Sequence, residues 1–252
     1  MEAIEKRAAL YHDRAMAYAR ALKKPPFHPE TVHRLRTHLR RLQAYAEFMQ
    51  RPKAASSLAK CVTWLSRLRT LDVCLRFLRR RRGDADDLRR VAWVLKEEGA
   101  MVAHAGRLDA IREVLAKTTV ARLSRPDDFL ARRLESLSRE HADRLNTALR
   151  GLSLKAKRKE LHCLRLLVKS LRYQEEIALD TSWGNPRSMA ALKRLQRTLG
   201  DFCDRDQFRR LAKKMKLACL GEMKMEYRLH RKRARIAVRR LVPPEPSAKL
   251  RR

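Results

Sequence analysis

The sequence predicts an all-α protein made of two related helical halves. Glycine and proline are few, 7 and 9 among 252 residues, and they stand at breaks between long amphipathic stretches. Runs of β-branched residues that would indicate strands are absent. In addition, the segment VHRLRTHLRRL at Val32–Leu42 returns as LHCLRLLVKSL at Leu161–Leu171. We therefore expect two four-helix bundles related by a pseudo-twofold axis.

Prolines bound the first helices of the chain. A first amphipathic helix is expected over residues 2–22, because the prolines of Lys23–Pro26 cannot continue it. Pro29 opens the second helix, which runs to about Gln50, since the fixed φ of proline suits a first helical turn.

The third helix follows Pro52 and ends at the run Arg79–Arg82, because cations are favourable at a helix C-terminus. Aspartates from Asp84 onward then open a fourth helix that ends before Lys117. A glycine is expected to break this helix, at one of two positions: Gly99 or Gly106.

The second half is expected to begin near residues 118–125, so that the halves span about residues 1–120 and 121–242 of one domain. A fifth helix starts after Pro126, and the second motif helix covers about residues 156–179. Residues 183–186 form a turn, a seventh helix follows, and the last helix ends near Leu241. The tail at 243–252 has three prolines and no apolar pattern, so we expect it to be disordered.

The charge of the chain points to anionic partners. Lysine and arginine total 61 against 28 acidic residues, which gives a formal charge of +33. Such a field concentrates polyanions and speeds their capture. Nucleic acid, polyphosphate and an anionic membrane surface all satisfy this condition, and charge does not choose among them.

The composition favours a cytoplasmic protein without cofactors. No apolar stretch is long enough to cross a membrane, and the first residues lack the apolar core of a secretory signal. The five cysteines include no Cys-x-x-Cys pair, so we expect reduced thiols rather than disulfides or a zinc site. Without a glycine-rich phosphate loop or a catalytic triad pattern, catalysis is not expected.

Each motif helix carries a histidine and cations on one stripe beside its apolar stripe. His33 corresponds to His162, Arg36 to Arg165 and Arg40 to Lys169, at positions i, i+3 and i+7. A solvated cationic face explains one such stripe, but chance seldom repeats a histidine and its cations in the same phase. We therefore interpret the two stripes as a phosphate-binding surface.

A second repeat supports the duplication. The segment LSRLRTLDV at 65–73 aligns with LGDFCDRDQ at 199–207, which places Asp72 on Asp206 and Arg69 on Cys203. With these paired motifs, nearly the whole chain, about residues 1–240, resembles the CHAD family, the conserved histidine α-helical domain. No CYTH-type Glu-x-Glu-x-Lys motif is present, so the chain looks like a stand-alone member.

The resemblance implies paired helical bundles with a basic central surface that binds inorganic polyphosphate, and association with polyphosphate granules. Carried over residue by residue, it implies these ligands: His33, Arg36, Arg40, Arg41, His162, Arg165, Lys169 and Arg172. The halves differ, since Ser170 stands at the position that matches Arg41. They therefore need not contribute equally.

Further cations extend the expected surface. The last helix places cations at steps of four, three, four and four, and the seventh helix adds one more. The candidates for polyphosphate binding are Arg197, Lys224, Arg228 and Arg231. Ordinary solvated surface explains them about as well. Asp201, Asp204 and Asp206 are expected to pair with arginines rather than to hold a metal.

The predicted function is non-enzymatic binding of inorganic polyphosphate in a basic groove between two helical bundles. Other polyanions, including nucleic acid at low salt, are expected to bind more weakly. The alternative is a nucleic-acid-binding helical protein, although no helix-turn-helix motif is found. A polyphosphate hydrolase or kinase accessory enzyme is a third, weaker alternative.

Overall fold

The computed structural model describes residues 2–152, 156–179, 181 and 185–241. These residues form helices and no strands, which confirms the all-α prediction. The helices are α1 (Glu2–Ala21), α2 (Pro29–Phe48), α3 (Pro52–Trp64), α4 (Ser66–Arg80), α5 (Ala85–His104), α6 (Arg107–Lys117), α7 (Val120–Leu123), α8 (Asp127–Arg150), α9 (Arg158–Ala178), α10 (Pro186–Met215) and α11 (Leu220–Arg239). The predicted tail and the first two residues of the predicted turn at 183–186 lie outside the described residues.

The structure divides two of the predicted helices. The expected third helix breaks at Leu65, whose backbone (φ −90°, ψ 0°) ends α3 and begins α4. The expected break in the fourth helix lies at Gly106 and not at Gly99. Gly106 has φ +62°, a left-handed conformation that glycine adopts without the steric cost that a Cβ imposes. The short helix α7 was not predicted.

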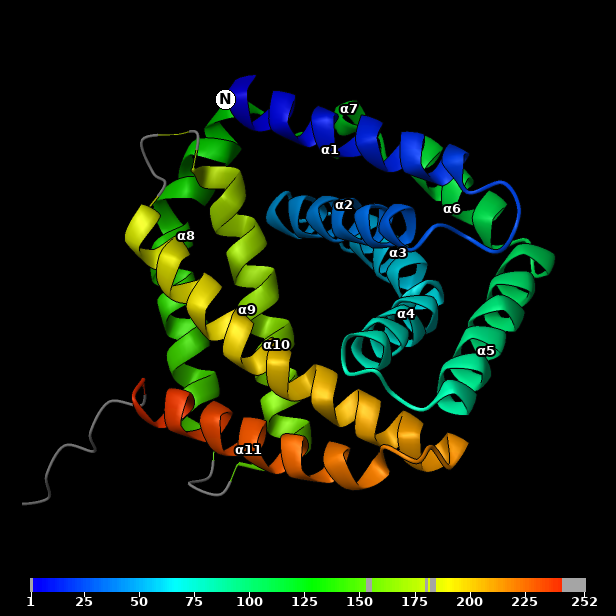
Figure 1. Cartoon of the computed structure of the whole chain (residues 1–252). Helices are drawn as coiled ribbons and strands as arrows, with labels where there is room; N and C mark the ends of the chain where they lie inside the picture. Colours follow the sequence, from blue (N-terminus) through cyan, green and yellow to red (C-terminus); the bar gives the residue numbers. More distant parts are fainter. Residues whose placement is uncertain (1, 153–155, 180, 182–184, 242–252) are drawn as a thin grey trace, which may run out of the picture.

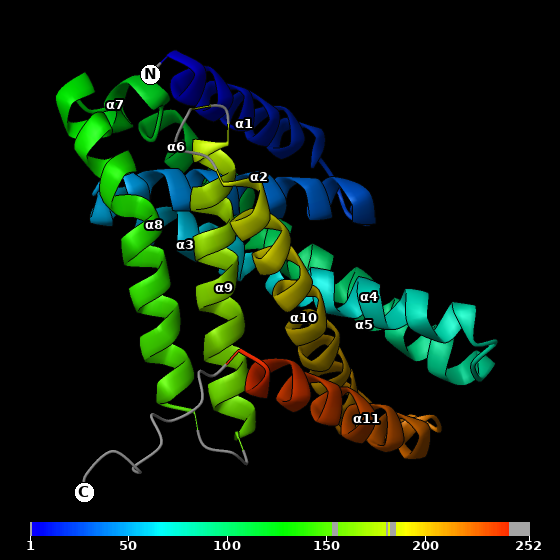
Figure 2. The ribbon, with the colours of Figure 1, turned by 90° about the vertical axis from the view of Figure 1, so that its left-hand side faces the viewer.

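The two motif helices, α2 and α9, contact each other near the centre of the molecule (Figure 1). On the N-terminal side α2 packs between α1 and α3. On the C-terminal side α9 packs against α8 and α10, and α11 runs along α10 (Figure 2). The helices α4 and α5 lie side by side, and α4 also reaches α10. Residues from both motif copies are therefore close in space.

The core consists of three apolar clusters. The first fills the space between α1, α2, α3 and α6, and includes Leu130 and Leu137 of α8 and Ile177 of α9. The second lies between α8, α9, α10 and α11, around Phe202. The third joins α4 and α5 to α10 and α11, around Phe208. These three clusters neither confirm nor contradict two four-helix bundles related by a pseudo-twofold axis, which stay a prediction.

Polar contacts join α9 to one helix of each half. Ser170 of α9 donates a hydrogen bond to Glu47 of α2 at 2.7 Å. His141 of α8 contacts Glu175 and Gln174 of α9 at 3.0 and 2.8 Å. These contacts fix α9 between α2 and α8. Among the described residues, no helix combines the length and apolar character that crossing a bilayer requires.

Candidate functional site

The apolar stripe of each motif helix sets the direction of its cationic stripe. Val32, Leu35 and Leu39 of α2 are buried, as are Leu161 and Leu164 of α9. On each helix the site positions i, i+3 and i+7, which begin one residue after Val32 or Leu161, therefore lie together at the edge of the core. The two histidines and their cations occupy these positions on both helices.

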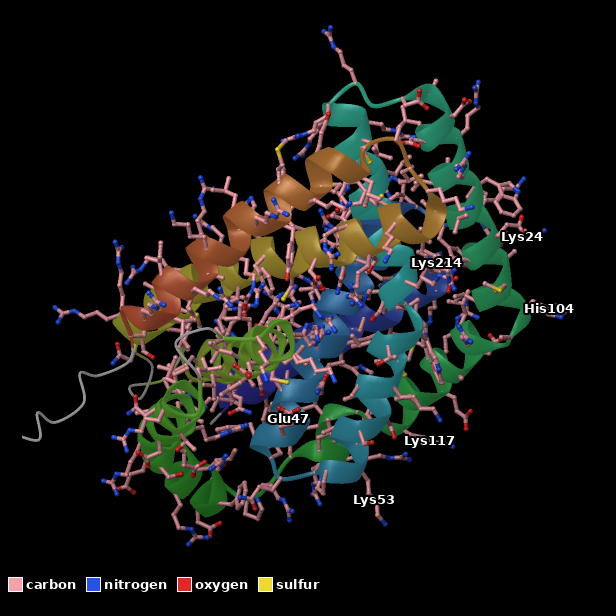
Figure 3. All side chains as sticks on the ribbon, turned by 90° about the horizontal axis from the view of Figure 1, so that it is seen from below. Lys24, Glu47, Lys53, His104, Lys117 and Lys214 are labelled. Carbon is pink, nitrogen blue, oxygen red and sulfur yellow. The ribbon has the colours of Figure 1, made fainter. Side chains whose placement is uncertain are left out.

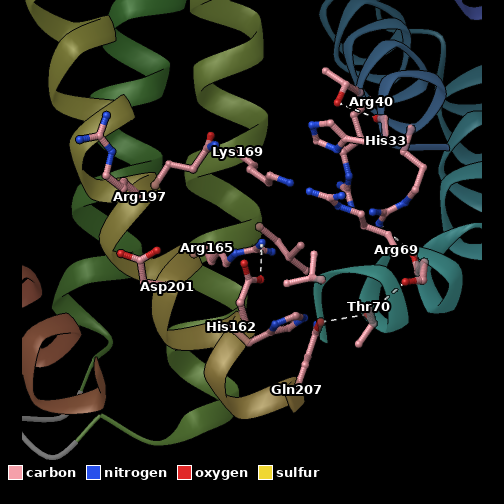
Figure 4. Close-up of a pocket in the computed structure, with 18 of the residues that line it drawn as sticks. His33, Arg40, Arg69, Thr70, His162, Arg165, Lys169, Arg197, Asp201 and Gln207 are labelled. Carbon is pink, nitrogen blue, oxygen red and sulfur yellow. Dashed lines mark hydrogen bonds and ion pairs between the residues drawn. The ribbon is translucent and has the colours of Figure 1, made fainter. Parts of the chain in front are cut away.

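The two cationic stripes face one cavity of about 550 Å³. Its walls come from α2, α4, α9 and α10. In Figure 4, Lys169 and Arg165 of α9 extend toward the side chains of α2 and α4, and Arg197 lies on the α10 side. The predicted site residues that line the cavity are His33, Arg36, Arg40, His162, Arg165, Lys169 and Arg197.

Several of these cations have no counter-ion within the described ranges of the chain. Among the described residues, no hydrogen bond or ion pair engages Arg40, Lys169 or Arg197, and Arg36 only donates to Ser66 Oγ, at 3.1 Å. The Nε atoms of Arg36 and Arg165 are buried without a hydrogen-bond partner. Buried donors are usually satisfied, so these atoms indicate a missing acceptor.

Burial and mutual repulsion make positive charge costly inside the cavity. Burial, followed by the charges of Arg40 and Arg165, lowers the pKa of Lys169 to about 6. Burial likewise lowers the pKa of Arg36 to about 10, with Arg40 and Arg69 adding to the shift. An anion in the cavity would offset both effects, because it supplies the opposite charge and the hydrogen-bond acceptors.

The surroundings of both motif histidines favour the neutral form. The pKa of His33 is lowered by burial first and then by Arg69. The pKa of His162 is lowered by burial and then by Arg165. His162 Nδ1 lies 3.8 Å from Cys203 Sγ, the residue that stands where the first half has Arg69. Nearby arginines thus place both histidines in a positive electrostatic field, but His162 has a thiol beside it where His33 has a guanidinium group.

Two buried aspartates at related positions pair with arginines, and among these arginines Arg69 lines the cavity. Asp72 accepts hydrogen bonds from Arg69 at 2.6 Å and from Arg76 at 2.7 Å. Its counterpart Asp206 contacts three arginines at 3.1 to 3.3 Å: Arg158, Arg209 and Arg210. This pairing confirms the expectation for Asp206. Asp204 also pairs with an arginine, while Asp201 lies exposed at the edge of the cavity.

The structure places two of the predicted ligands outside this cavity. Arg41 and Arg172 both bind Glu176, at 2.6 and 3.1 Å. Tyr11 also donates a hydrogen bond to that carboxylate, at 3.2 Å. Glu176 neutralises one of the two positive charges and occupies both guanidinium groups, so these residues form a separate ion-pair cluster.

The predicted ligands of α11 also lie apart from the cavity. Lys224 and Arg228 are exposed, and Arg231 is half-buried with an unpartnered Nε. None of the three lines the cavity walls that the structure describes. Figure 3 shows how many cationic side chains lie at the periphery, Lys53 and Lys117 among them.

Sequence reasoning did not include the contribution of α4. Arg69, Ser66 and Thr70 line the cavity opposite Gln207 of α10, and Thr70 Oγ1 donates to Gln207 Oε1 at 3.2 Å. The repeat between segments 65–73 and 199–207 was the available signal, because it marks both segments as related parts of the two halves. Its cationic member, Arg69, could have been found from that signal.

The fold and the site define an all-α protein in which two copies of a histidine-and-cation helix share one cationic cavity. A model of the CHAD domain family matches residues 7–213, which is most of the chain. The chain therefore belongs to the CHAD domain family. No curated protein and no solved structure matches it.

Proposed function

We propose that this protein binds inorganic polyphosphate in the cavity between α2, α4, α9 and α10, and that it does so without catalysing a reaction. The observation that carries the proposal is a set of cations from both motif helices for which the described part of the chain supplies no anionic partner: Arg36, Arg40 and Lys169, with Arg197 at the edge. The association of the CHAD family with polyphosphate binding supports it.

A phosphate chain suits the chemistry of these walls. Guanidinium groups bind phosphate oxygens two at a time, and the histidines donate further hydrogen bonds. A single phosphate chain is narrow and carries closely spaced charge without bases or sugars. Such a chain can enter a cavity of about 550 Å³. A nucleic-acid duplex is too wide and too rigid to fit there.

The cavity residues favour binding over chemistry. Cys74 lines the cavity, and Cys203 lies beside it next to His162. Burial raises the pKa of both thiols, that of Cys203 to about 11, and keeps them protonated. Incubation of the protein with polyphosphate and magnesium or manganese tests this part of the proposal. Release of phosphate above the protein-free rate would contradict it.

The direct test is polyphosphate binding by a variant in which His33, Arg36, His162 and Arg165 are all replaced by glutamine. We expect affinity to fall about a hundredfold or more, because several charge-assisted hydrogen bonds are lost together. The matched control replaces these exposed residues outside the cavity by glutamine: His28, Lys53, His104 and Arg122. Both variants lose the same formal charge.

The outcome separates a site from a general field. If both variants bind polyphosphate equally well, the cavity is not the binding site. Competition at physiological salt addresses the second candidate: displacement of polyphosphate by DNA at equal phosphate concentration would favour nucleic acid as the partner. For the cell, we propose a cytoplasmic protein at polyphosphate granules, which imaging of a tagged wild type beside the cavity variant would test.

A further inference from the structure

Asp204 is unlike the other aspartates around the cavity. Asp72 and Asp206 are buried, and each accepts hydrogen bonds from at least two arginines. Asp204 lines the cavity and keeps 42% of its side-chain surface accessible. It is a carboxylate that a bound ligand can reach in a largely cationic cavity, and Asp201 at the edge is the other carboxylate among the described residues of its lining.

The hydrogen-bonding capacity of Asp204 is unused. Its nearest cation is Arg165, whose Nη2 lies 3.7 Å from Oδ1, which is too long for a hydrogen bond. Among the described residues, no donor forms a hydrogen bond with its carboxylate. The related position in the first half is Thr70, whose hydroxyl is engaged with Ser66 and Gln207. The second half therefore adds an open acceptor where the first half has a satisfied hydroxyl.

A carboxylate in an anion-binding cavity discriminates between kinds of phosphate oxygen. It repels an ionised oxygen, but it accepts a hydrogen bond from a protonated one. Burial raises the pKa of Asp204, although Arg165 opposes this shift, so the carboxylate gains from any donor that approaches it. The ligand group that suits Asp204 is thus a phosphate that carries a proton.

In a linear polyphosphate only the two terminal groups meet this description near neutral pH. Internal groups have a single, strongly acidic oxygen, whereas a terminal group has a second ionisation with a pKa near that of a phosphate monoester, about 6. We propose that Asp204 gives the cavity a preference for the end of a phosphate chain, because its carboxylate accepts a hydrogen bond from the terminal P–OH group. This inference rests on the polyphosphate binding proposed above.

The test compares a linear hexaphosphate with cyclic hexametaphosphate, which has no ends. Titration calorimetry at about pH 6, with a chelator present, gives the affinity ratio for wild type, Asp204→Asn and Asp143→Asn. Asp143 is an exposed residue of α8 outside the cavity. We expect the ratio in favour of the linear chain to fall about tenfold in Asp204→Asn, as for one hydrogen bond to a charged group, and to be unchanged in Asp143→Asn.

The ratio of the affinities for the linear and the cyclic ligand cancels any change in affinity that both ligands share. If Asp204→Asn strengthens or weakens the binding of both ligands equally, Asp204 only repels charge or positions Arg165, and the inference is overturned. A linear preference that appears only without chelator would assign the carboxylate to a bridging metal ion and also overturn it. If wild type binds neither ligand, the proposed function itself fails. Circular dichroism of each variant verifies that it is folded.

Discussion

Lys169 makes the stability of the protein depend on pH through a single side chain. Its ammonium group lies near Arg36, Arg40 and Arg165 without an ion-pair partner among the described residues, and its pKa is lowered to about 6. Between about pH 6 and the unfolded pKa of about 10.4, the unfolded chain binds this proton and the empty folded protein does not. The stability of the empty protein therefore rises with pH across this window, as far as Lys169 contributes.

Binding of a polyanion should reverse the shift at Lys169. At pH 8 we expect polyphosphate binding to take up a proton, because the anion favours the ammonium form. Calorimetry in buffers of different ionisation enthalpy measures this uptake. Lys169→Met should reduce it, and Lys53→Met, an exposed control, should leave it unchanged. Equal uptake by both variants would assign the proton to another group.

The two motif histidines make binding sensitive to mild acid. Burial and the nearby arginines lower the pKa of His33 and of His162, so both are largely neutral at pH 7.5 in the empty protein. Protonation adds charge and a donor, so we expect tighter polyphosphate binding at pH 6 than at pH 7.5. Replacement of both histidines by glutamine should reduce this gain, measured as the ratio of dissociation constants. A gain that persists in full would refute their protonation.

At the scale of the helices, local sequence signals placed most boundaries. Pro29 opens α2, Pro52 opens α3 and Pro186 opens α10. Proline suits the first position of a helix because its φ is fixed near the helical value and the missing N–H would have no partner there. The break at Leu65 has no glycine or proline beside it, so the sequence carried no sign of it. Tertiary packing of α3 and α4 against different neighbours determines that boundary instead.

The same contrast holds for the site. His33 and Arg36 were predictable because a helical period and an internal repeat are local features. The exclusion of Arg41 was not predictable, because its partner Glu176 lies 135 residues away. Ion pairs of this kind depend on how helices cross, and a single sequence does not reveal that.

Two glycines provide a test of helix geometry. Gly106 separates α5 from α6 with φ +62°, and a Cβ added there would meet no atom within 4 Å, so Gly106→Ala suffers only backbone strain. We expect it to lower the free energy of unfolding by about 1 kcal/mol. Gly221 in the first turn of α11 also has open space but no positive φ. Gly221→Ala should raise that free energy by about 0.5 kcal/mol or more.

Chemical denaturation of both variants beside wild type measures the difference. Opposite signs are expected, since the two substitutions add the same methyl group in different backbone conformations. Equal effects would mean that the left-handed conformation at Gly106 does not set the boundary between α5 and α6.

The net charge governs the behaviour of the whole molecule. A formal charge of +33 opposes compaction, so added salt should raise the melting temperature of the empty protein. Polyphosphate should raise it further, by about 5 to 10 °C at a hundred times the dissociation constant. That second increment should shrink as salt increases.

Differential scanning calorimetry over a salt series measures both effects. The cavity variant described above provides the control: it should keep the response to salt and lose most of the response to polyphosphate. A variant that keeps both responses in full would indicate that polyphosphate acts on the surface as a whole.

The first apolar cluster draws on residues far along the chain. Leu130, Leu137, Ile177 and Ala178 complete a core that begins with Ile4. During synthesis the N-terminal helices therefore emerge long before the side chains that cover them. Part of this apolar cluster therefore stays uncovered on the growing polypeptide until the end of α9 has left the ribosome, and over that interval the chain is exposed to chaperones and proteases.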